Sequence, residues 1–396
     1  MPDGSETLAL RVVDRIAAIP AKAWNACAGG ENPFTTHAFL AALEASGSVS
    51  DETGWLAQHL IAEDAGGRIV AVVPLYLKSH SYGEYVFDHG WAQAYMHAGG
   101  RYYPKLQVAV PFTPVTGHRL LVRPAIDRPA IEPALISGLE QVAKRAGVSS
   151  LHVTFCTKSE AEAFRRAGWL IRRGVQYHWH NRGYSTFDQF LAQLTHERRK
   201  AIRRERRGVA EQGIAIETLT GDAITRAHWD TFFRFYTSTS DRKWGNPYLT
   251  RDFFARLGAV MPERVVLFLA RKEGAYIGGA LNLRGGDTLY GRNWGCRGDH
   301  KFLHFEACYY QAIDYAIAHK LARVEAGAQG EHKIRRGYLP EMTWSAHWIA
   351  NSSFRQAVAD FLARETPSVV EEADDLAAHS PFRLPDGLRS QSGEHR

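Results

Sequence analysis

The sequence predicts an α+β protein made of two similar domains, each a mostly antiparallel sheet flanked by helices. Its 396 residues are too many for one ordinary core and suit two domains of about 150–200 residues each. Hydrophobic residues make up 45% of the chain, which is enough to build packed cores. One order of elements, three strands followed by a long amphipathic helix and a further strand, occurs twice, and it is typical of an α+β fold.

The first copy of this order occupies residues 55–155, where β-rich runs are separated by a glycine-containing turn. The predicted strands are 55–63, 68–77 and 84–88, followed by a helix over 131–146 and a strand over 151–155. The second copy has strands at 264–271, 276–283 and 288–294, a helix at 304–319 and a strand at 323–326. We therefore predict two domains that join near residues 181–184.

A strongly basic helix is predicted at the start of the second domain, over residues 187–212. Its apolar residues recur at helical spacing, so one side is expected to pack on the sheet. Residues 196–207 hold seven Arg or Lys and two Glu. Two neighbouring basic rows share one side of the helix: Arg199, Arg203 and Arg206, and Lys200, Arg204 and Arg207. This surface is either a solvated helix face or a binding site for a phosphate-rich partner.

Cysteine usage and hydropathy restrict the class of protein. The four cysteines are widely spaced and lack the pattern of a zinc site, so we predict reduced thiols, no metal centre and a cytoplasmic location. No apolar run reaches the roughly 18 residues that a membrane span needs, and the N-terminus lacks a signal-peptide pattern. Nucleotide-binding motifs of the Walker or Rossmann type are absent. The polar tail 386–396 is predicted to be disordered.

Several stretches, taken in order, resemble the FemAB-like family of the GNAT (acyl-CoA N-acyltransferase) superfamily. In the second domain they are the basic stretch 198–207 (RRKAIRRERR), the hairpin 274–282 with 290–292, the helix after 300–303, and 327–337 (GAQGEHKIRRG). In the first domain, the aromatic-rich segments 81–91 and 102–114 look like the subgroup described as peptidoglycan biosynthesis or recognition proteins.

The resemblance implies two tandem GNAT-like domains and amide-bond formation on an amine. We expect residues 1–181 to hold the acceptor and residues 182–385 to hold the donor. In characterised family members the donor is aminoacyl-tRNA and the acceptor is a cell-wall precursor peptide, so the basic helix is a candidate tRNA-binding surface. GNAT enzymes that use acyl-CoA bind its pyrophosphate before the main helix, where this chain offers His300 and Lys301. The donor is therefore aminoacyl-tRNA or acyl-CoA, used as a co-substrate rather than a tightly bound cofactor.

Acyl transfer to an amine needs stabilisation of an oxyanion and a route for a proton. Lys333, in the polar loop after the last predicted strand, would stabilise the oxyanion or a phosphate, and His332 would shuttle a proton. Glu306 would take the proton of the amine or position it; the alternative is a carboxylate that caps a helix or forms an ion pair. Arg336 is predicted to support phosphate binding.

Other residues are candidates for substrate binding. Tyr290, Arg292 and Trp294 alternate along one strand and would share a face, either as a pocket wall or as cross-strand packing. The remaining candidates are Asp88 and His89, for the acceptor amine, and Trp244. The competing function is a non-catalytic module that recognises a peptide or muropeptide through aromatic clefts.

Overall fold

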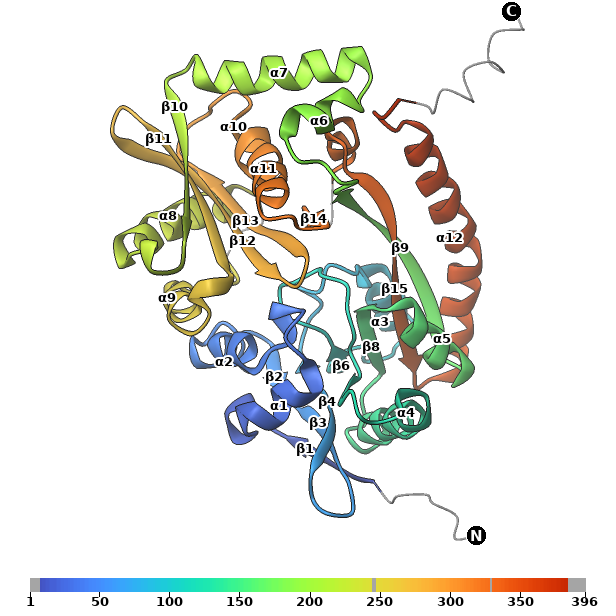
Figure 1. Cartoon of the computed structure of the whole chain (residues 1–396). Helices are drawn as coiled ribbons and strands as arrows, with labels where there is room; N and C mark the ends of the chain where they lie inside the picture. The colour runs from blue at the N-terminus through green and yellow to red at the C-terminus, as the bar shows by residue number, and fades with distance from the viewer. Residues whose placement is uncertain (1–7, 244–246, 328–329, 384–396) are drawn as a thin grey trace, which may run out of the picture.

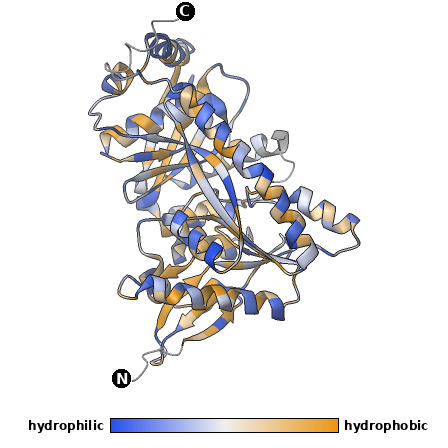
Figure 2. Cartoon of the chain, turned by 90° about the vertical axis from the view of Figure 1, so that its right-hand side faces the viewer, coloured by the Kyte–Doolittle hydropathy of each residue, from blue (hydrophilic) through white to orange (hydrophobic). Residues whose placement is uncertain are grey.

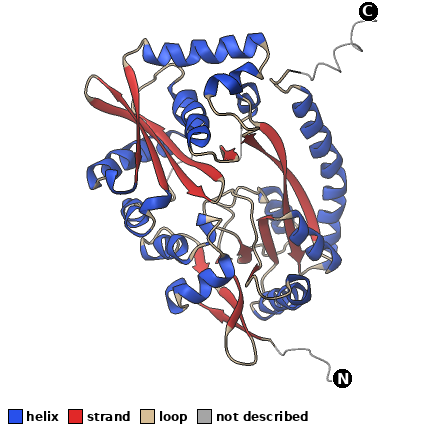
Figure 3. Ribbon diagram, viewed as in Figure 1, coloured by secondary structure: helices blue, strands red, loops and turns tan. Residues whose placement is uncertain are grey.

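The computed structural model describes residues 8–243, 247–327 and 330–383, and it confirms the α+β class. Within these residues the strands form two sheets with helices around them (Figure 1, Figure 3). Four strands form the smaller sheet in the order β1-β3-β4-β7, and eleven form the larger one in the order β10-β11-β12-β13-β14-β9-β15-β8-β6-β5-β2. The tail predicted to be disordered lies outside the described residues.

A bent hairpin near the N-terminus belongs to both sheets. Its strands are β2 (Trp55–Ala57), β3 (His59–Glu63), β4 (Ile69–Val73) and β5 (Leu75–Lys78), and the smaller sheet is completed by β1 (Ala9–Val13) and β7 (Leu121–Val122). β3 pairs with β4 in the smaller sheet, whereas β2 pairs with β5 in the larger one. Pro74 separates β4 from β5, because proline has no N–H to donate to a sheet. The two long strands predicted here are therefore each divided into two.

The strand predicted over 84–88 does not form. This segment is a loop that leads into α3 (His89–His97). The ammonium of Lys105, on β6 (Lys105–Val108), lies 2.7 Å from a carboxylate oxygen of Glu84 and 2.5 Å from one of Asp88. Buried ion pairs, rather than strand pairing, hold the loop in place.

The two halves repeat one arrangement around a pair of parallel strands. In the first half, β6 runs parallel to β8 (Ser150–Cys156), and α4 (Arg128–Arg145) precedes β8. In the second half, β13 runs parallel to β14, and a helical segment connects them. The strands of the second half are β10 (Ile214–Thr220), β11 (Val265–Lys272), β12 (Ala275–Gly285), β13 (Thr288–Cys296) and β14 (Arg323–Glu325). This repetition agrees with the order read from the sequence.

Each half also receives a strand from the other. β9 (Leu170–His180) follows β8 in sequence but pairs with β14, whereas β15 (Leu339–Ile349) follows β14 but pairs with β8. β9 and β15 pair with each other, so the larger sheet continues through the middle of the molecule. The division of the chain between residues 181 and 182 stays a prediction.

The predicted basic helix is two helices. α6 (Phe187–Ala192) and α7 (His196–Ala210) are separated by a turn, at which Leu194 forms a β-bridge with Phe382. In Figure 1, α7 lies across the end of the segment that contains α10 (Leu303–Phe305) and α11 (Gln311–Ala318). The other helices are α1 (Ala21–Ala28), α2 (His37–Ala45), α5 (Lys158–Arg166), α8 (Arg226–Lys243), α9 (Arg251–Val260) and α12 (Ser352–Ala378).

The hydrophobic core joins the two halves. β4 is buried along its whole length, and the strands nearest the N-terminus are mainly hydrophobic in Figure 2. Phe39 of α2 packs edge-on against Phe253 of α9, with ring centroids 5.8 Å apart. Burial of such apolar surface is the main force that holds the halves together. Among the described residues, no helix is both long and apolar enough to cross a membrane.

Candidate active site

A cavity opens where the parallel strands β13 and β14 separate. The last paired residues are Tyr290 and Glu325, and Arg292 then forms a bulge opposite β12. The cavity has a volume of about 120 Å³; we call it the splay cavity. Its lining comes from β12, β13, the helical segment after β13 and the end of β14: Ala280, Leu281, Asn282, Gly291, Arg292, Asn293, Trp294, His304, Cys308, Tyr309 and Ala326.

An irregular turn of helix brings aromatic and polar groups to this cavity. Residues Glu306–Tyr310 form a π-helical turn between α10 and α11, a feature often found at functional sites. The imidazole of His304 lies 5.5 Å from the Trp294 ring and 5.3 Å from the Tyr309 ring, measured between centroids. The cavity is therefore lined by hydrogen-bonding and aromatic groups together with small aliphatic ones.

Tyr309 and His332 form a polar pair at the edge of the cavity. The Tyr309 hydroxyl lies 2.9 Å from Nε2 of His332. Burial raises the pKa of Tyr309 far above its usual value, so the side chain keeps its proton and can act as a donor. His332 comes from the 3-10 turn η6 (Glu331–Arg336), which follows β14.

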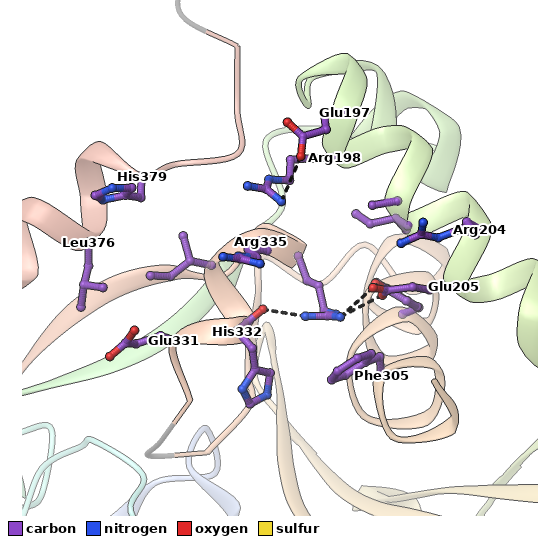
Figure 4. A pocket seen from close by; sticks show the side chains of 15 residues that line it. Glu197, Arg198, Arg204, Glu205, Phe305, Glu331, His332, Arg335, Leu376 and His379 are labelled. Carbon is purple, nitrogen blue, oxygen red and sulfur yellow. Dashed lines mark hydrogen bonds and ion pairs between the residues drawn. The ribbon is translucent and has the colours of Figure 1, made fainter. Parts of the chain in front are cut away.

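A larger cleft, with a volume of about 790 Å³, lies on the other side of His332 (Figure 4). We call it the α7 cleft, because α7 forms one wall, while η6 and the end of α12 form others. Its charged lining mixes both signs: Glu197, Arg198, Arg204, Glu205, Glu331, Arg335 and Arg336, with His332 and His379. Since His332 lines the cleft and contacts Tyr309, which lines the cavity, this pair lies between the two spaces.

Arg336, the predicted phosphate contact, is engaged within the protein. Its Nη2 lies 2.8 and 3.0 Å from the two carboxylate oxygens of Glu205 on α7, and its guanidinium stacks on the Phe305 ring at 3.4 Å. The side chain of Glu205 also accepts a hydrogen bond from Tyr310. Arg336 thus ties η6 to α7 at the base of the α7 cleft.

Lys333 lies beneath the same loop. It is 2% exposed, and its ammonium donates a hydrogen bond of 2.9 Å to the carbonyl of Gly327. Burial lowers the pKa of Lys333 to about 8, and an electrostatic interaction with Cys308 opposes that shift. Because Cys308 lines the splay cavity, the lysine adds positive charge close to it. Its role as an oxyanion stabiliser stays a prediction.

Glu306 lies on a different side of the helix. One oxygen is 3.1 Å from Nη2 of Arg206 and accepts a hydrogen bond of 2.8 Å from Gln311. Arg206 also pairs with Asp314, at 2.7 Å. Burial raises the pKa of Glu306, and Arg206 opposes this shift. These contacts hold α7 on the helical segment 303–318, and they do not bring Glu306 to the lining of the cavity or the cleft.

The basic rows on α7 are partly accessible. Arg206 is half-buried by the ion pairs just described, and Arg203 forms an exposed pair with Asp188 at 2.9 Å. The other members of the two rows, Arg199, Lys200, Arg203, Arg204 and Arg207, all keep exposed or half-exposed side chains. At the start of α10, Nε2 of His300 contacts the carbonyl of Arg297, and the Lys301 ammonium lies over the Phe302 ring.

The structure separates the predicted substrate-binding residues. Arg292 and Trp294 both line the splay cavity, but Trp294 packs against His304, whereas Arg292 donates a hydrogen bond of 2.5 Å to the carbonyl of Phe112 in the first half. Tyr290 is buried and is not part of the lining. The bulge breaks the regular alternation that would have placed the three on one face. Asp88 is buried against Lys105, His89 is exposed beside Phe87, and Trp244 lies outside the described residues.

Sequence reasoning missed Tyr309, His304 and Cys308 as cavity residues. Regular helical phasing places Tyr309 on the buried arc, which is correct, but it gives no reason to distinguish this residue from other core aromatics. The π-helical turn has no clear signature in the sequence. The signal that could have identified His304 and Tyr309 is their position on the helix that follows the strand at which the sheet separates.

Comparison with known proteins gives a family and a fold. Residues 15–384 match the model of the FemAB-like family, described as peptidoglycan biosynthesis/recognition. The crystal structure of FemX is similar, with 12% identity and a TM-score of 0.56, over 86% of this chain and 98% of that one. L-PGS from Bacillus licheniformis has 10% identity and a TM-score of 0.51, over 84% and 98%.

A conserved protein of unknown function from Bacteroides thetaiotaomicron has 9% identity and a TM-score of 0.50, over 87% of this chain and 100% of its own. No curated protein matches the chain significantly. The family match confirms the predicted resemblance to the FemAB-like family, and the crystal structure of FemX shares the fold of this chain.

Proposed function

Because the chain belongs to the FemAB-like family, we propose that it transfers a small acyl or aminoacyl group to an amine, with the splay cavity as the reaction centre. The amine would belong to a cell-wall precursor peptide, held by the first half of the chain (residues 1–181). The donor, aminoacyl-tRNA or acyl-CoA, would be held by the second half (residues 182–385).

The observation that carries this proposal is that the cleft and the cavity adjoin at the contact between His332 and Tyr309. The α7 cleft is wide enough for the end of a large donor, at about 790 Å³, and the splay cavity, at about 120 Å³, suits only a small group. His332 and Tyr309 lie between them. A donor in the cleft could therefore place its carbonyl at the Tyr309 hydroxyl, with the transferred group in the cavity.

The cavity supplies what the transition state needs. Attack of an amine on a carbonyl develops negative charge on the carbonyl oxygen, and a fixed hydrogen-bond donor stabilises it. Tyr309 keeps its proton, because burial raises its pKa. An N–H at Nε2 of His332 would donate to the hydroxyl oxygen, which fixes the hydroxyl and leaves its proton for the carbonyl. The ammonium of buried Lys333 would add a favourable field. The exposed arginines of α7 would bind the donor's phosphates at the entrance of the cleft.

An activity assay tests the proposal. The purified protein would be incubated with a muropeptide mixture and either radiolabelled acetyl-CoA or tRNA charged with labelled amino acids, and label joined to an amine would be measured. Tyr309→Phe should lower kcat by about a hundred- to a thousandfold, because it removes one oxyanion donor. Tyr184→Phe, at a buried tyrosine outside the cavity, is the matched control and should keep normal turnover.

Two results would contradict the proposal. Binding of muropeptide without transfer from either donor would favour a recognition module. Normal turnover by Tyr309→Phe would remove the splay cavity as the reaction centre.

A further inference from the structure

Glu325 is a buried carboxylate at the edge of the splay cavity. It is the last residue of β14 to pair with β13, opposite Tyr290. A side chain at Gly291 would come within 3.3 Å of the Glu325 carbonyl, and the next residue, Ala326, lines the cavity. The strands therefore separate directly after Glu325.

The side chain of Glu325 is on the face of the sheet that looks toward the first half. Val324 packs in the core around α11, and successive side chains of a strand point to opposite faces. Tyr290, opposite Glu325, packs its ring edge-on against Phe34 of the first half, with centroids 5.2 Å apart. An amine presented by the first half would therefore reach the cavity from the side on which Glu325 lies.

One oxygen of this carboxylate has no hydrogen bond among the described residues. Glu325 is 4% exposed; its Oε1 lies 3.3 Å from Nε of Arg323, while Oε2 is unsatisfied and 3.9 Å from Nε2 of His178. A buried, unsatisfied polar atom typically costs about 1–3 kcal/mol, and more when charged, so its presence in a native structure calls for an explanation. A group that waits for a substrate proton is one such explanation.

His178 is oriented beside this oxygen. The amide nitrogen of Gln176 donates a hydrogen bond of 2.5 Å to the carbonyl of Pro114, so the Gln176 oxygen faces Nε2 of His178, at 3.3 Å. Nε2 therefore carries a hydrogen. Burial lowers the pKa of His178 to about 3, so the imidazole is neutral and can orient the carboxylate without neutralising it.

We propose that Glu325 accepts the proton of the acceptor amine, directly or through one water, and that His178 is a positioning residue for it. The inference rests on the transfer reaction proposed above. It replaces Glu306 in that role, because contacts with Arg206 and Gln311 hold the Glu306 side chain toward α7 rather than toward the first half.

Proton transfer to Glu325 precedes formation of the amide bond. The acceptor ammonium gives one proton to Glu325, and the free amine attacks the donor carbonyl. The new C–N bond forms as the donor's C–O bond (ester) or C–S bond (thioester) breaks, and a second nitrogen proton goes to the leaving oxygen or sulfur.

The surroundings of Glu325 suit this role near neutral pH. Burial raises its pKa to about 7, opposed by Arg323 and Arg292, and an acceptor titrating near the working pH is the most effective kind. The ionisable groups that face it come from four strands: Arg323 on β14, Tyr290 and Arg292 on β13, His178 and His180 on β9, and Glu341 on β15.

The test compares Glu325→Gln with the wild type over a range of pH, using the donor that labels muropeptides in the assay above. Between pH 8 and pH 6, the wild-type kcat/KM should fall about tenfold more than the kcat/KM of the variant. The variant lacks the carboxyl whose protonation slows the wild-type enzyme in this range. At pH 8 the variant should be about 10²–10⁴-fold slower. His178→Leu should shift the acid limb to higher pH, since it removes the polar Nε2–H group that lies 3.9 Å from the charged carboxylate.

Glu132→Gln is the matched control, since Glu132 is also buried, has a raised pKa and lies on α4, outside the cavity. Glu325→Asp covers the case in which Glu325→Gln does not fold, and it should keep the acid limb but lose at least tenfold in rate. Wild-type rates and pH dependence in Glu325→Gln would overturn the inference while leaving the transferase intact. An unfolded Glu325→Gln with a fully active Glu325→Asp would also overturn it, and no transfer by the wild type would reject the proposed function itself.

Discussion

Removing the charge of Glu205 should destabilise the protein strongly, because Glu205 holds the loop after β14 on α7. Arg336 is 6% exposed, and its Nη2 contacts both oxygens of Glu205, at 2.8 and 3.0 Å. Glu205→Gln would leave the guanidinium buried without a counter-charge. Breaking a buried pair in this way typically costs about 3–5 kcal/mol. An unfolding entropy of about 2.1 cal/mol/K per residue amounts to about 0.8 kcal/mol/K for 396 residues, so the melting temperature should fall by roughly 4–6 °C.

Urea unfolding followed by circular dichroism measures this cost, with Asp188→Asn as the matched control. Asp188 pairs with Arg203 of the same helix at 2.9 Å, but both side chains are exposed, so its loss should cost less than about 1 kcal/mol. Adding Arg336→Met to Glu205→Gln should recover most of the stability, because no unpaired charge remains. A loss of stability in Glu205→Gln no larger than that in Asp188→Asn would refute the role of Glu205 in holding the loop.

Two further predictions concern basic residues. Burial lowers the pKa of Lys333 to about 8 from an ordinary value of 10.5. The unfolded chain therefore binds the proton of Lys333 more tightly than the folded chain does. The free energy of unfolding should rise with pH between about 8 and 10.5. Lys333→Met should remove this rise, of about 3 kcal/mol, from the pH dependence of the unfolding free energy, and an unchanged dependence would contradict the prediction. If α7 binds tRNA, reversing the charges of Arg199, Arg203 and Arg204 should weaken binding and flatten its salt dependence by about 0.7–0.9 log units per contact; binding that is independent of salt in the wild type would reject an electrostatic role.

Local patterns in the sequence predict most of the individual elements. The glycine turn at 65–67 gives the first hairpin, and the spacing of apolar residues gives α4 and α11. Pro74 was visible in the sequence, but the sequence alone does not tell a strand that ends at a proline from one that bends into another sheet. The loop at 84–88 looked β-rich, yet its acidic residues are drawn to Lys105, about 20 positions away.

The site depends on contacts that no local pattern records. Glu306 looked catalytic because it stands in the first turn of a helix, but its partner, Arg206, comes from a helix 100 residues earlier. Glu325 was read as part of a plain strand, because its burial results from pairing with β9 and from packing against the first half. Lys333 was predicted as a site residue because the loop around it is polar, although the side chain itself is buried.

The exchange of strands β9 and β15 determines when each half can complete its sheet during synthesis of the chain. β8 lacks its β15 neighbour until residue 349 has left the ribosome, so the nascent first half carries an open strand edge while about half of the chain is still being made. Exposed edges of this kind are prone to wrong pairing and aggregation. The two halves therefore cannot complete their sheets one after the other; each is finished only by the other, in the last steps of folding.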